Sequence, residues 1–406
     1  MQACLDPFPD DIKRVFLAYS GGLDSSVLLH LLVCAGRSYE IIPWHINHGL
    51  LDVAMQMEQF CIAQAEKYDL VARVDHLELG DIKGNIEAEA RHQRYHLFKR
   101  ETVVGDCVLT AHHADDQAET LLLNALRGSG TAGLRGIARR RSFGGGILLR
   151  PLLGFSRADI EDYADIHNLD WFDDPSNASN RFDRNYLRNQ VIPAIRQRWP
   201  HYQDAFSTVS ELQSETQDVL DEIGRIDFEQ AKGAESDGIA TLDKPTLLAL
   251  SEGRRKNLIR YWITHQGLPV LPHNRLQELL RQLHSRPDSM PQIAMSDYSV
   301  RLYDQRLFLV RSNIDTICPG VFEFGLNSEI DIDPLELHLQ RESVFELLQV
   351  RDQGQQLTLK IPGEETSEQD DRHRLKRMFQ KQRVPPWLRS SVARIYLDGR
   401  LEGILL

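Results

Sequence analysis

The stretch Ala18-Tyr19-Ser20-Gly21-Gly22-Leu23-Asp24-Ser25-Ser26 follows the apolar run 15–18 and opens a helical pattern that extends to Ala35. Its adjacent glycines let backbone N–H groups approach an anion closely, because neither residue carries a Cβ. The helix that follows directs the positive end of its dipole at the same position. A phosphate group is therefore expected at this turn, and an ordinary βα turn with a serine N-cap is the alternative. The GxxxxGKS/T pattern of a Walker loop is absent from the sequence.

Around this stretch, from Arg14 to Trp199, short apolar runs alternate with amphipathic segments. The apolar runs are 15–18, 41–46, 70–74 and 107–111, and helical patterns cover 25–35, 55–68, 86–100 and 115–126. This βαβα order is typical of a parallel sheet with helices on both faces. We therefore predict an α/β fold, a doubly wound parallel sheet, which binds its ligand at the carboxyl ends of the strands.

Beyond Trp199 the pattern changes to long polar helices over 204–223, 245–266 and 274–283, with strand-like alternation at 299–302 and 306–310. A mainly helical domain and a small α+β C-terminal module are expected there. The predicted boundaries are 1–202 for the nucleotide-binding domain, 203–315 for the helical domain, 316–344 for a linker and 345–406 for the last module.

The composition narrows the class of protein. At roughly 150 residues per domain, 406 residues suggest two or three domains. No apolar run approaches the roughly 18 residues of a membrane-spanning helix, and residues 1–13 do not resemble a signal peptide. A cytoplasmic protein with no membrane partner is expected. The five cysteines form no CxxC pair, so neither a disulfide framework nor a zinc or iron–sulfur site is indicated.

The charge is unevenly distributed. With 47 basic and 59 acidic residues, the net charge of -12 by itself argues against a nucleic-acid partner. However, the segments 135–141, 181–198 and 372–383 are strongly basic. Each of them fits either a contact with an anionic polymer or a solvated surface.

The glycine-containing stretch resembles the signature of the N-type ATP pyrophosphatases, also called the PP-loop family, which adenylate a substrate and release pyrophosphate. The resemblance implies that ATP phosphates lie against the loop residues Ser20, Gly21, Gly22, Leu23, Asp24 and Ser25. A carboxylate beside a triphosphate requires a cation between them, so Asp24 implies Mg²⁺.

Further motifs resemble the tRNA(Ile)-lysidine synthetases within that family. They are His45-Ile46-Asn47-His48-Gly49-Leu50, the segments 85–88, 90–95, 110–120, 127–130, 150–152, 174–177 and 184–188, and Val384-Pro385-Pro386-Trp387-Leu388-Arg389. The resemblance implies ATP-dependent ligation of L-lysine to C2 of the wobble cytidine in isoleucine tRNA with a CAU anticodon. An adenylated cytidine is the implied intermediate.

Acidic residues begin the predicted helix over 115–126. Asp116 and Glu119 are spaced i, i+3 and share one face of that helix, although acids in a first turn are also ordinary partners of the helix dipole. The attacking lysine amine must be neutral, which costs roughly 4 to 5 kcal/mol at pH 7, so a carboxylate that accepts its proton is expected. We predict Asp116 for that role or as a second Mg²⁺ ligand with Asp24, and Glu119 as the next candidate.

The resemblance also suggests residues that hold substrates. Arg91 is a candidate catalytic residue and Arg94 a substrate contact, since both are expected to hold ATP or the adenylated base; pairing with Glu87 or Glu89 is the alternative. The remaining substrate or RNA contacts predicted are His112, Arg184, Asn185, Arg188, Arg374, Lys376 and Arg377. A homodimer and a monomer both stay open.

Two rival functions remain. A PP-loop tRNA thiolase would need paired or persulfide-bearing cysteines, which the sequence does not indicate. A noncatalytic tRNA-binding protein with a relic ATP loop is the other, and the complete 20–25 signature together with Asp116 argues against it.

Overall fold

The computed structural model describes residues 11–36, 39–47, 49, 54–77, 86–173, 180, 182–236, 239–284, 290–312, 320–325, 330–332, 337–339, 356–361, 369–389, 392–397 and 400–405. Most of the predicted linker 316–344 and the whole 174–177 motif lie outside the described residues. The chain divides into two compact units, Met1–Val219 and Leu220–Leu406. The predicted four-part division stays a prediction.

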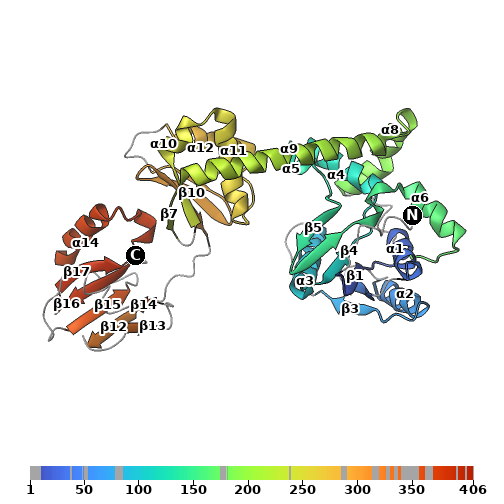
Figure 1. Ribbon diagram of the computed structural model, residues 1–406, viewed down its shortest axis with the longest axis horizontal. Helices are drawn as coiled ribbons and strands as arrows, with labels where there is room; N and C mark the ends of the chain where they lie inside the picture. Colours follow the sequence, from blue (N-terminus) through green and yellow to red (C-terminus); the bar gives the residue numbers. More distant parts are fainter. Residues whose placement is uncertain are drawn as a thin grey trace. The chain divides into compact units, whose positions relative to one another are not determined.

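A six-stranded sheet forms the centre of the first unit (Figure 1). Its order is β3 (Arg73–His76), β2 (Glu40–Asn47), β1 (Arg14–Ala18), β4 (Asp106–Leu109), β6 (Gly146–Leu149) and β5 (Arg140–Phe143). All pairs are parallel except β5 with β6. The strand order reverses between β1 and β4, and such a switch point opens a crevice at the carboxyl ends of the strands.

Helices cover both faces of this sheet because successive strand side chains point to opposite sides. Val15 and Leu17 join a core with α1 (Leu23–Cys34), α2 (Ala54–Glu66) and α6 (Arg157–Ile166). Phe16 lies in a separate core that includes Trp44 of β2 and Phe98 of α3 (Ile86–Glu101). The predicted doubly wound α/β fold is confirmed.

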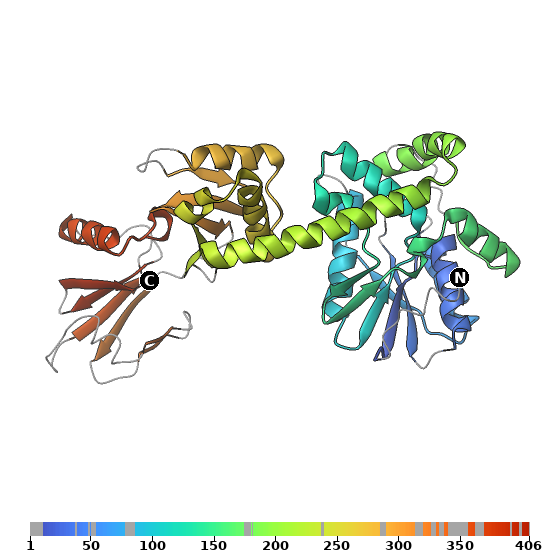
Figure 2. The same ribbon diagram turned by 45° about the horizontal axis from the view of Figure 1, so that its top comes forward.

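The helices α4 (Ala114–Leu126), α5 (Thr131–Leu134), α7 (Asp183–Tyr186) and α8 (Ile192–Arg198) complete the first unit, with a π-helical turn at Leu187–Val191 and a 3₁₀ turn at Pro151–Gly154. The helix α9 (Tyr202–Ala231) begins there and is unbroken over 30 residues (Figure 2). It begins and ends beyond the predicted 204–223, and the boundary between the two units falls within it.

The second unit contains a five-stranded antiparallel sheet with the order β7 (Lys232–Ser236), β8 (Ile239–Asp243), β11 (Arg306–Arg311), β10 (Tyr298–Tyr303) and β9 (Gln292–Ala294). The predicted strands at 299–302 and 306–310 are β10 and β11. The predicted helix 245–266 is two helices, α10 (Lys244–Ala249) and α11 (Glu252–His265), because Leu250 has an extended backbone that interrupts them. The third predicted helix is α12 (His273–Gln282).

The last part of the chain is a small α+β module, as predicted. Its sheet has the order β12 (Gly320–Gly325), β15 (Gln356–Ile361), β16 (Ala393–Leu397) and β17 (Arg400–Leu405), and a strand pair joins β13 (Ile330–Ile332) to β14 (Leu337–Leu339). The helix α14 (Gln369–Lys381) buries Leu375 and Phe379 against Tyr396 and Leu401. Within the described residues, no helix is long and apolar enough to cross a membrane.

Candidate active site

The turn between β1 and α1 requires glycine at its centre. Gly21 has a φ of +79°, where L side chains are strained, and a Cβ there would lie 2.9 Å from the Cys61 sulfur. Ser25 Oγ donates to the Gly22 carbonyl at 2.9 Å and lies 3.1 Å from Ser20 Oγ. The turn therefore holds two hydroxyls and the start of α1 around one point, as an anion site requires.

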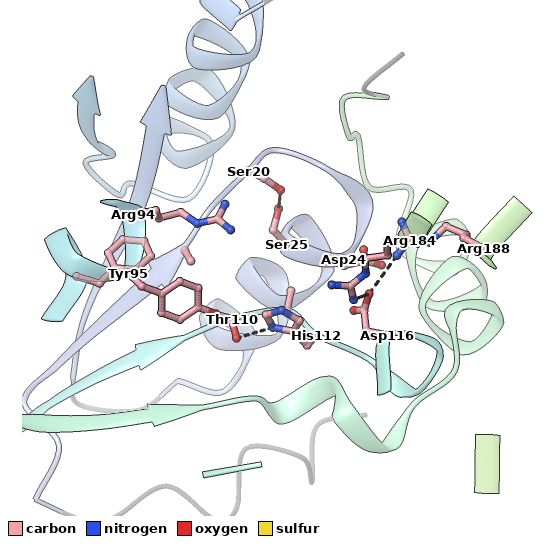
Figure 3. A pocket seen from close by; sticks show the side chains of 13 residues that line it. Ser20, Asp24, Ser25, Arg94, Tyr95, Thr110, His112, Asp116, Arg184 and Arg188 are labelled. Carbon is pink, nitrogen blue, oxygen red and sulfur yellow. Dashed lines mark hydrogen bonds and ion pairs between the residues drawn. The ribbon is translucent and has the colours of Figure 1, made fainter. Parts of the chain in front are cut away.

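A cavity of about 330 Å³ opens beside this turn (Figure 3). Its walls come from the ends of β1 and β4, the starts of α1 and α4, the helix α3, and the segment that contains α7. The lining residues are Ala18, Ser20, Asp24, Ser25, Arg94, Tyr95, Phe98, Thr110, Ala111, His112, Asp116, Arg184 and Arg188. Predicted residues from the nucleotide turn, α3, α4 and the α7 segment thus surround one cavity, although these segments lie far apart in the sequence.

Other predicted site residues lie elsewhere. Glu119 is buried and absent from the lining, and Leu23 is buried in the core. The Arg91 guanidinium lies 5.1 Å from the centre of the Tyr95 ring, and Asn185 is in α7 between the two lining arginines. The predicted tRNA contacts Arg374, Lys376 and Arg377 are exposed on α14 in the second unit.

Two arginines and two carboxylates form an ion-pair cluster at one end of the cavity, which we call the arginine clamp. Asp116 Oδ1 accepts hydrogen bonds from Arg184 at 2.8 Å and Arg188 at 3.1 Å. Glu119 accepts from the Nε atoms of the same arginines at 2.8 and 2.7 Å. The sequence assigned the arginines to RNA and the acids to catalysis, whereas the structure joins all four side chains.

Neighbouring histidines and the clamp arginines keep Asp116 ionised. Burial by itself would raise the pKa of this carboxyl, but His113, His112 and the two clamp arginines together outweigh burial and hold the pKa below its usual range. The His113 backbone N–H donates to Asp116 Oδ2 at 3.1 Å, and the His113 Nε2 atom lies 3.5 Å from the same oxygen. Asp116 is therefore suited to attract a cation and poorly suited to retain a proton.

Asp24, in the first turn of α1, has a different environment. Its side chain is 29% exposed, and Oδ1 accepts a hydrogen bond from Arg157 at 2.8 Å. Burial raises the pKa of Asp24, and the neighbouring Asp116 carboxylate adds to this, although His113 and Arg157 oppose it. Asp24 is therefore a carboxylate whose negative charge is incompletely balanced, which favours a bound cation.

The two carboxylates fit a magnesium ion shared with a ligand. His113 Nε2 lies 3.8 Å from an Asp24 oxygen and 3.5 Å from an Asp116 oxygen, so both carboxylates border the same space. In the part of the chain that the structure describes, no group of three or more His, Cys, Asp or Glu side chains could hold a metal. Mg²⁺ commonly takes one or two carboxylates and completes its shell with phosphate oxygens and water.

Asp115 joins four helices behind the cavity. Its Oδ2 accepts the backbone N–H of Arg157 at 2.8 Å, at the start of α6. Its Oδ1 accepts hydrogen bonds from Tyr202 at the start of α9 and from Arg196 of α8, the latter at 3.0 Å. Since the Arg157 side chain contacts Asp24, this network connects the start of α9 to the nucleotide turn.

His112 lies at the end of β4 with its Nδ1 atom 2.8 Å from Thr110 Oγ1. Burial lowers the pKa of His112 to about 3, although the Asp116 carboxylate opposes this effect. The ring is therefore neutral at pH 7, and because Thr110 engages Nδ1, the Nε2 atom is left to donate or accept one hydrogen bond with a bound base.

Sequence reasoning missed several residues of this site. Tyr95 and Phe98 add an aromatic wall from α3. Phe98 follows the predicted Arg94 by four residues, and this helical spacing could have indicated that both side chains lie on the same face of α3. Arg157 and His113 were missed as partners of Asp24. His113 directly follows the predicted His112, whereas nothing near Arg157 in the sequence indicates its contact.

Two segments of the chain match protein-family models. Residues 2–195 match the PP-loop domain, and residues 242–308 match the TilS substrate binding domain. The first range contains the whole cavity described above. The second covers most of the five-stranded sheet and the helices α11 and α12.

Three relatives match along nearly the whole chain, and each bears the name tRNA(Ile)-lysidine synthase. The protein of Serratia proteamaculans is 36% identical over 97% of this chain and 91% of its own length. Those of Yersinia pseudotuberculosis and Pectobacterium atrosepticum are each 34% identical, over 96% and 95% of this chain and 88% of their own lengths. Among solved structures, the U34-tRNA thiolase NcsA of Methanococcus maripaludis, with its 4Fe-4S cluster, is 16% identical over 52% of this chain and 77% of its own, with a TM-score of 0.46.

Proposed function

The chain belongs to the tRNA(Ile)-lysidine synthase family, and from that membership we propose that it ligates L-lysine to the wobble cytidine of isoleucine tRNA with a CAU anticodon, using ATP. One observation of the structure carries the proposal. A single cavity joins the hydroxyls and carboxylate of the nucleotide turn to an aromatic wall and to the arginine clamp. It thus offers an anion site, a surface for a base and a cation-attracting carboxylate.

The proposed chemistry has two steps. O2 of cytidine attacks the α-phosphorus of ATP, forming an O–P bond as pyrophosphate departs. The neutral lysine ε-amine then attacks C2, and the C2–O bond breaks as AMP leaves. Adenylation is needed because the unmodified C2 oxygen is a poor leaving group.

Residues of the nucleotide turn serve the first step in this proposal. The Ser20 and Ser25 hydroxyls and the backbone N–H groups of the turn hold phosphate oxygens. Asp24 and Asp116 would hold Mg²⁺, which neutralises phosphate charge when bound. Tyr95 and Phe98 offer a face on which a base released from the anticodon loop can stack.

For the second step, with pyrophosphate gone and no cation between Asp24 and Asp116, we propose that the clamp carboxylate Asp116 attracts the lysine ammonium. Its low pKa makes it a strong electrostatic partner and a weak proton acceptor. With no cation bound, Asp24 is the stronger base because its pKa is raised, and we propose that it accepts the proton that the lysine ammonium loses before the amine attacks C2. Glu119 is buried against both arginines, and we propose a positioning role for it.

The tRNA body requires phosphate contacts beyond the cavity. We propose that Arg374, Lys376 and Arg377 on α14 provide some of them. Replacing all three by glutamine is expected to weaken tRNA binding and to reduce the slope of log Kd against log salt by about two to three. Filter binding at several salt concentrations measures the slope, and a slope equal to that of the wild type contradicts the assignment.

The cysteines give little support to a thiolase. Burial raises the pKa of Cys61 and Cys107 to about 12, so neither thiol is a ready nucleophile. Cys34 is exposed and forms no disulfide with another described cysteine, while Cys4 and Cys318 lie outside the described residues. A noncatalytic tRNA-binding role is disfavoured by the names of the three relatives described above, each of which denotes a synthase. A cytoplasmic location accords with a tRNA substrate, and a homodimer and a monomer are both compatible with the proposal.

The decisive experiment incubates the protein with ATP, Mg²⁺, labelled lysine and isoleucine tRNA with a CAU anticodon. Label is expected in acid-insoluble RNA, at the wobble nucleotide after nuclease digestion. A transcript with uridine at the wobble position is the matched control and should remain unlabelled. Absence of label from the CAU tRNA, with ATP bound and the protein folded, would overturn the proposal.

A further inference from the structure

Two adjoining cavities lie in the second unit, on the sheet that contains β9, β10 and β11. Their volumes are about 380 and 270 Å³, and taken together they have the size of sites that hold small ligands. Both are lined by Gln292, Arg301 and Trp387. They therefore form two parts of one site around these three side chains.

A stacked arginine and tryptophan stand at the centre of this site. The Arg301 guanidinium carbon lies 5.0 Å from the centre of the Trp387 ring, and Arg301 Nε donates to Ser299 Oγ at 2.9 Å. The Trp387 ring packs against Phe308 and Tyr303 at centroid distances of 5.4 and 6.0 Å, with steep angles between the ring planes. These contacts hold the pair in place before any ligand binds.

The segment that carries Trp387 is itself anchored to this sheet. Arg383 forms an ion pair with Asp304, in the turn between β10 and β11, at 2.9 Å. The residues Pro385 and Pro386 then restrict the backbone that leads to Trp387. The site is consequently built by two separated stretches of the sequence.

The charge of the site differs from that of the chain. The described lining residues include Arg301 and Arg311 but no aspartate or glutamate, although the chain has a net charge of -12. Gln292 and the serine hydroxyls 299 and 312 add uncharged hydrogen-bonding groups. An anionic ligand with an aromatic part matches this combination.

We propose that this site binds one unpaired nucleotide of the tRNA, with its base stacked on the Trp387 and Arg301 pair and its phosphate against Arg311. Bases stack both on aromatic rings and on guanidinium planes. The proposal rests on the proposed function, because that function supplies the tRNA. A free nucleotide such as AMP has the same chemistry, and the second experiment below distinguishes it from a nucleotide of the tRNA.

The first test measures tRNA affinity of the full chain by filter binding. We expect Trp387→Leu to raise Kd about 5- to 100-fold, since stacking on one aromatic residue commonly contributes that much. Trp387→Phe keeps an aromatic ring and should retain most of the affinity. It therefore distinguishes a loss of stacking from a general effect of changing this position. Arg311→Met, which removes the proposed phosphate contact, should also lower the salt slope by about one.

Arg281→Met is the matched control, because Arg281 is an exposed arginine of α12 in the same unit and lines neither cavity. It should leave the Kd within twofold of the wild type. At saturating tRNA, the rate of lysidine formation should be unchanged in all of these variants. Equal affinity for Trp387→Leu and Arg281→Met, at equal melting temperature, overturns the inference.

A second test identifies the occupant. Ultraviolet crosslinking of the wild-type complex, followed by mass spectrometry, should attach an unpaired tRNA nucleotide to a peptide that contains Trp387 or Arg301. Millimolar AMP should leave this crosslink intact, and its loss would indicate a free-nucleotide site instead. If the wild type forms lysidine but gives no such crosslink, only this inference fails; if it neither binds tRNA nor forms lysidine, the proposed function fails.

Discussion

The starts of α1 and α4 follow neighbouring parallel strands and each present an acidic residue to the same cavity, yet their electrostatics are opposite. Asp24 has one arginine partner and a raised pKa, whereas Asp116 has two and a lowered pKa. The difference comes from residues brought in from elsewhere: Arg157 at the first helix and the pair Arg184 and Arg188 at the second. Similar local patterns thus acquire different chemical roles from their surroundings.

The largest effect is expected from Asp24→Asn, which removes the charge that the turn presents to a cation. Lysidine formation should fall about 10³-fold, because bound metal ions stabilise transition-state charge by several kcal/mol. Affinity for tRNA should change less than twofold. Label incorporation and filter binding measure the two quantities, and a rate within tenfold of the wild type contradicts the role of Asp24.

A smaller effect is expected from Asp116→Asn, because Glu119 still pairs with both arginines. Lysidine formation should decline about 10²-fold, as for loss of one electrostatic contact to reacting groups. The matched control is Asp106→Asn, since Asp106 is also buried and accepts two hydrogen bonds from Arg14, outside the cavity.

The control should lower stability but keep the rate within about twofold of the wild type. Full turnover by Asp116→Asn, with ATP and Mg²⁺ binding intact, would remove Asp116 from the mechanism. An equal loss of rate in both variants would show that the effect is only structural.

The neutral His112 should make the fold sensitive to acid. Because its pKa falls from 6.5 to about 3 on folding, the unfolded chain binds more protons between these values, and stability declines as the pH falls through 6.5. Between pH 7 and pH 5 this one group should cost about 2 kcal/mol of unfolding free energy. Urea unfolding of the wild type and of His112→Asn at pH 7 and pH 5 measures this loss of unfolding free energy, which should be about 2 kcal/mol larger in the wild type. Equal losses in the two proteins would mean that His112 stays charged in the fold.

The smallest effect concerns the network around Asp115. Tyr202→Phe removes one hydroxyl donor, and we expect the KM for ATP to rise about fivefold, corresponding to about 1 kcal/mol, with little change in kcat. Tyr163→Phe is the matched control: its hydroxyl lies 3.0 Å from His30, away from Asp115. Equal KM values for ATP in Tyr202→Phe and Tyr163→Phe would mean that the start of α9 does not position the nucleotide turn.

The alternation of apolar and amphipathic segments was sufficient to predict the doubly wound fold, and the carboxyl ends of its strands located the cavity. The arginine clamp was not predictable, since Arg184 and Arg188 reach the same two carboxylates across about 70 residues of sequence and through a π-helical turn. Arg157 reaches Asp24 across 133 residues. Such pairings depend on tertiary packing, which local periodicity does not encode.

Cys61 gives the nucleotide turn a natural chemical reporter. Its sulfur is buried directly beneath Gly21, in the place that a side chain at that position would fill. A thiol reagent can reach it only when the turn lifts away, so alkylation of Cys61 measures how often the turn opens. A ligand that holds the turn closed protects this cysteine, and occupancy of the site can be followed without any turnover.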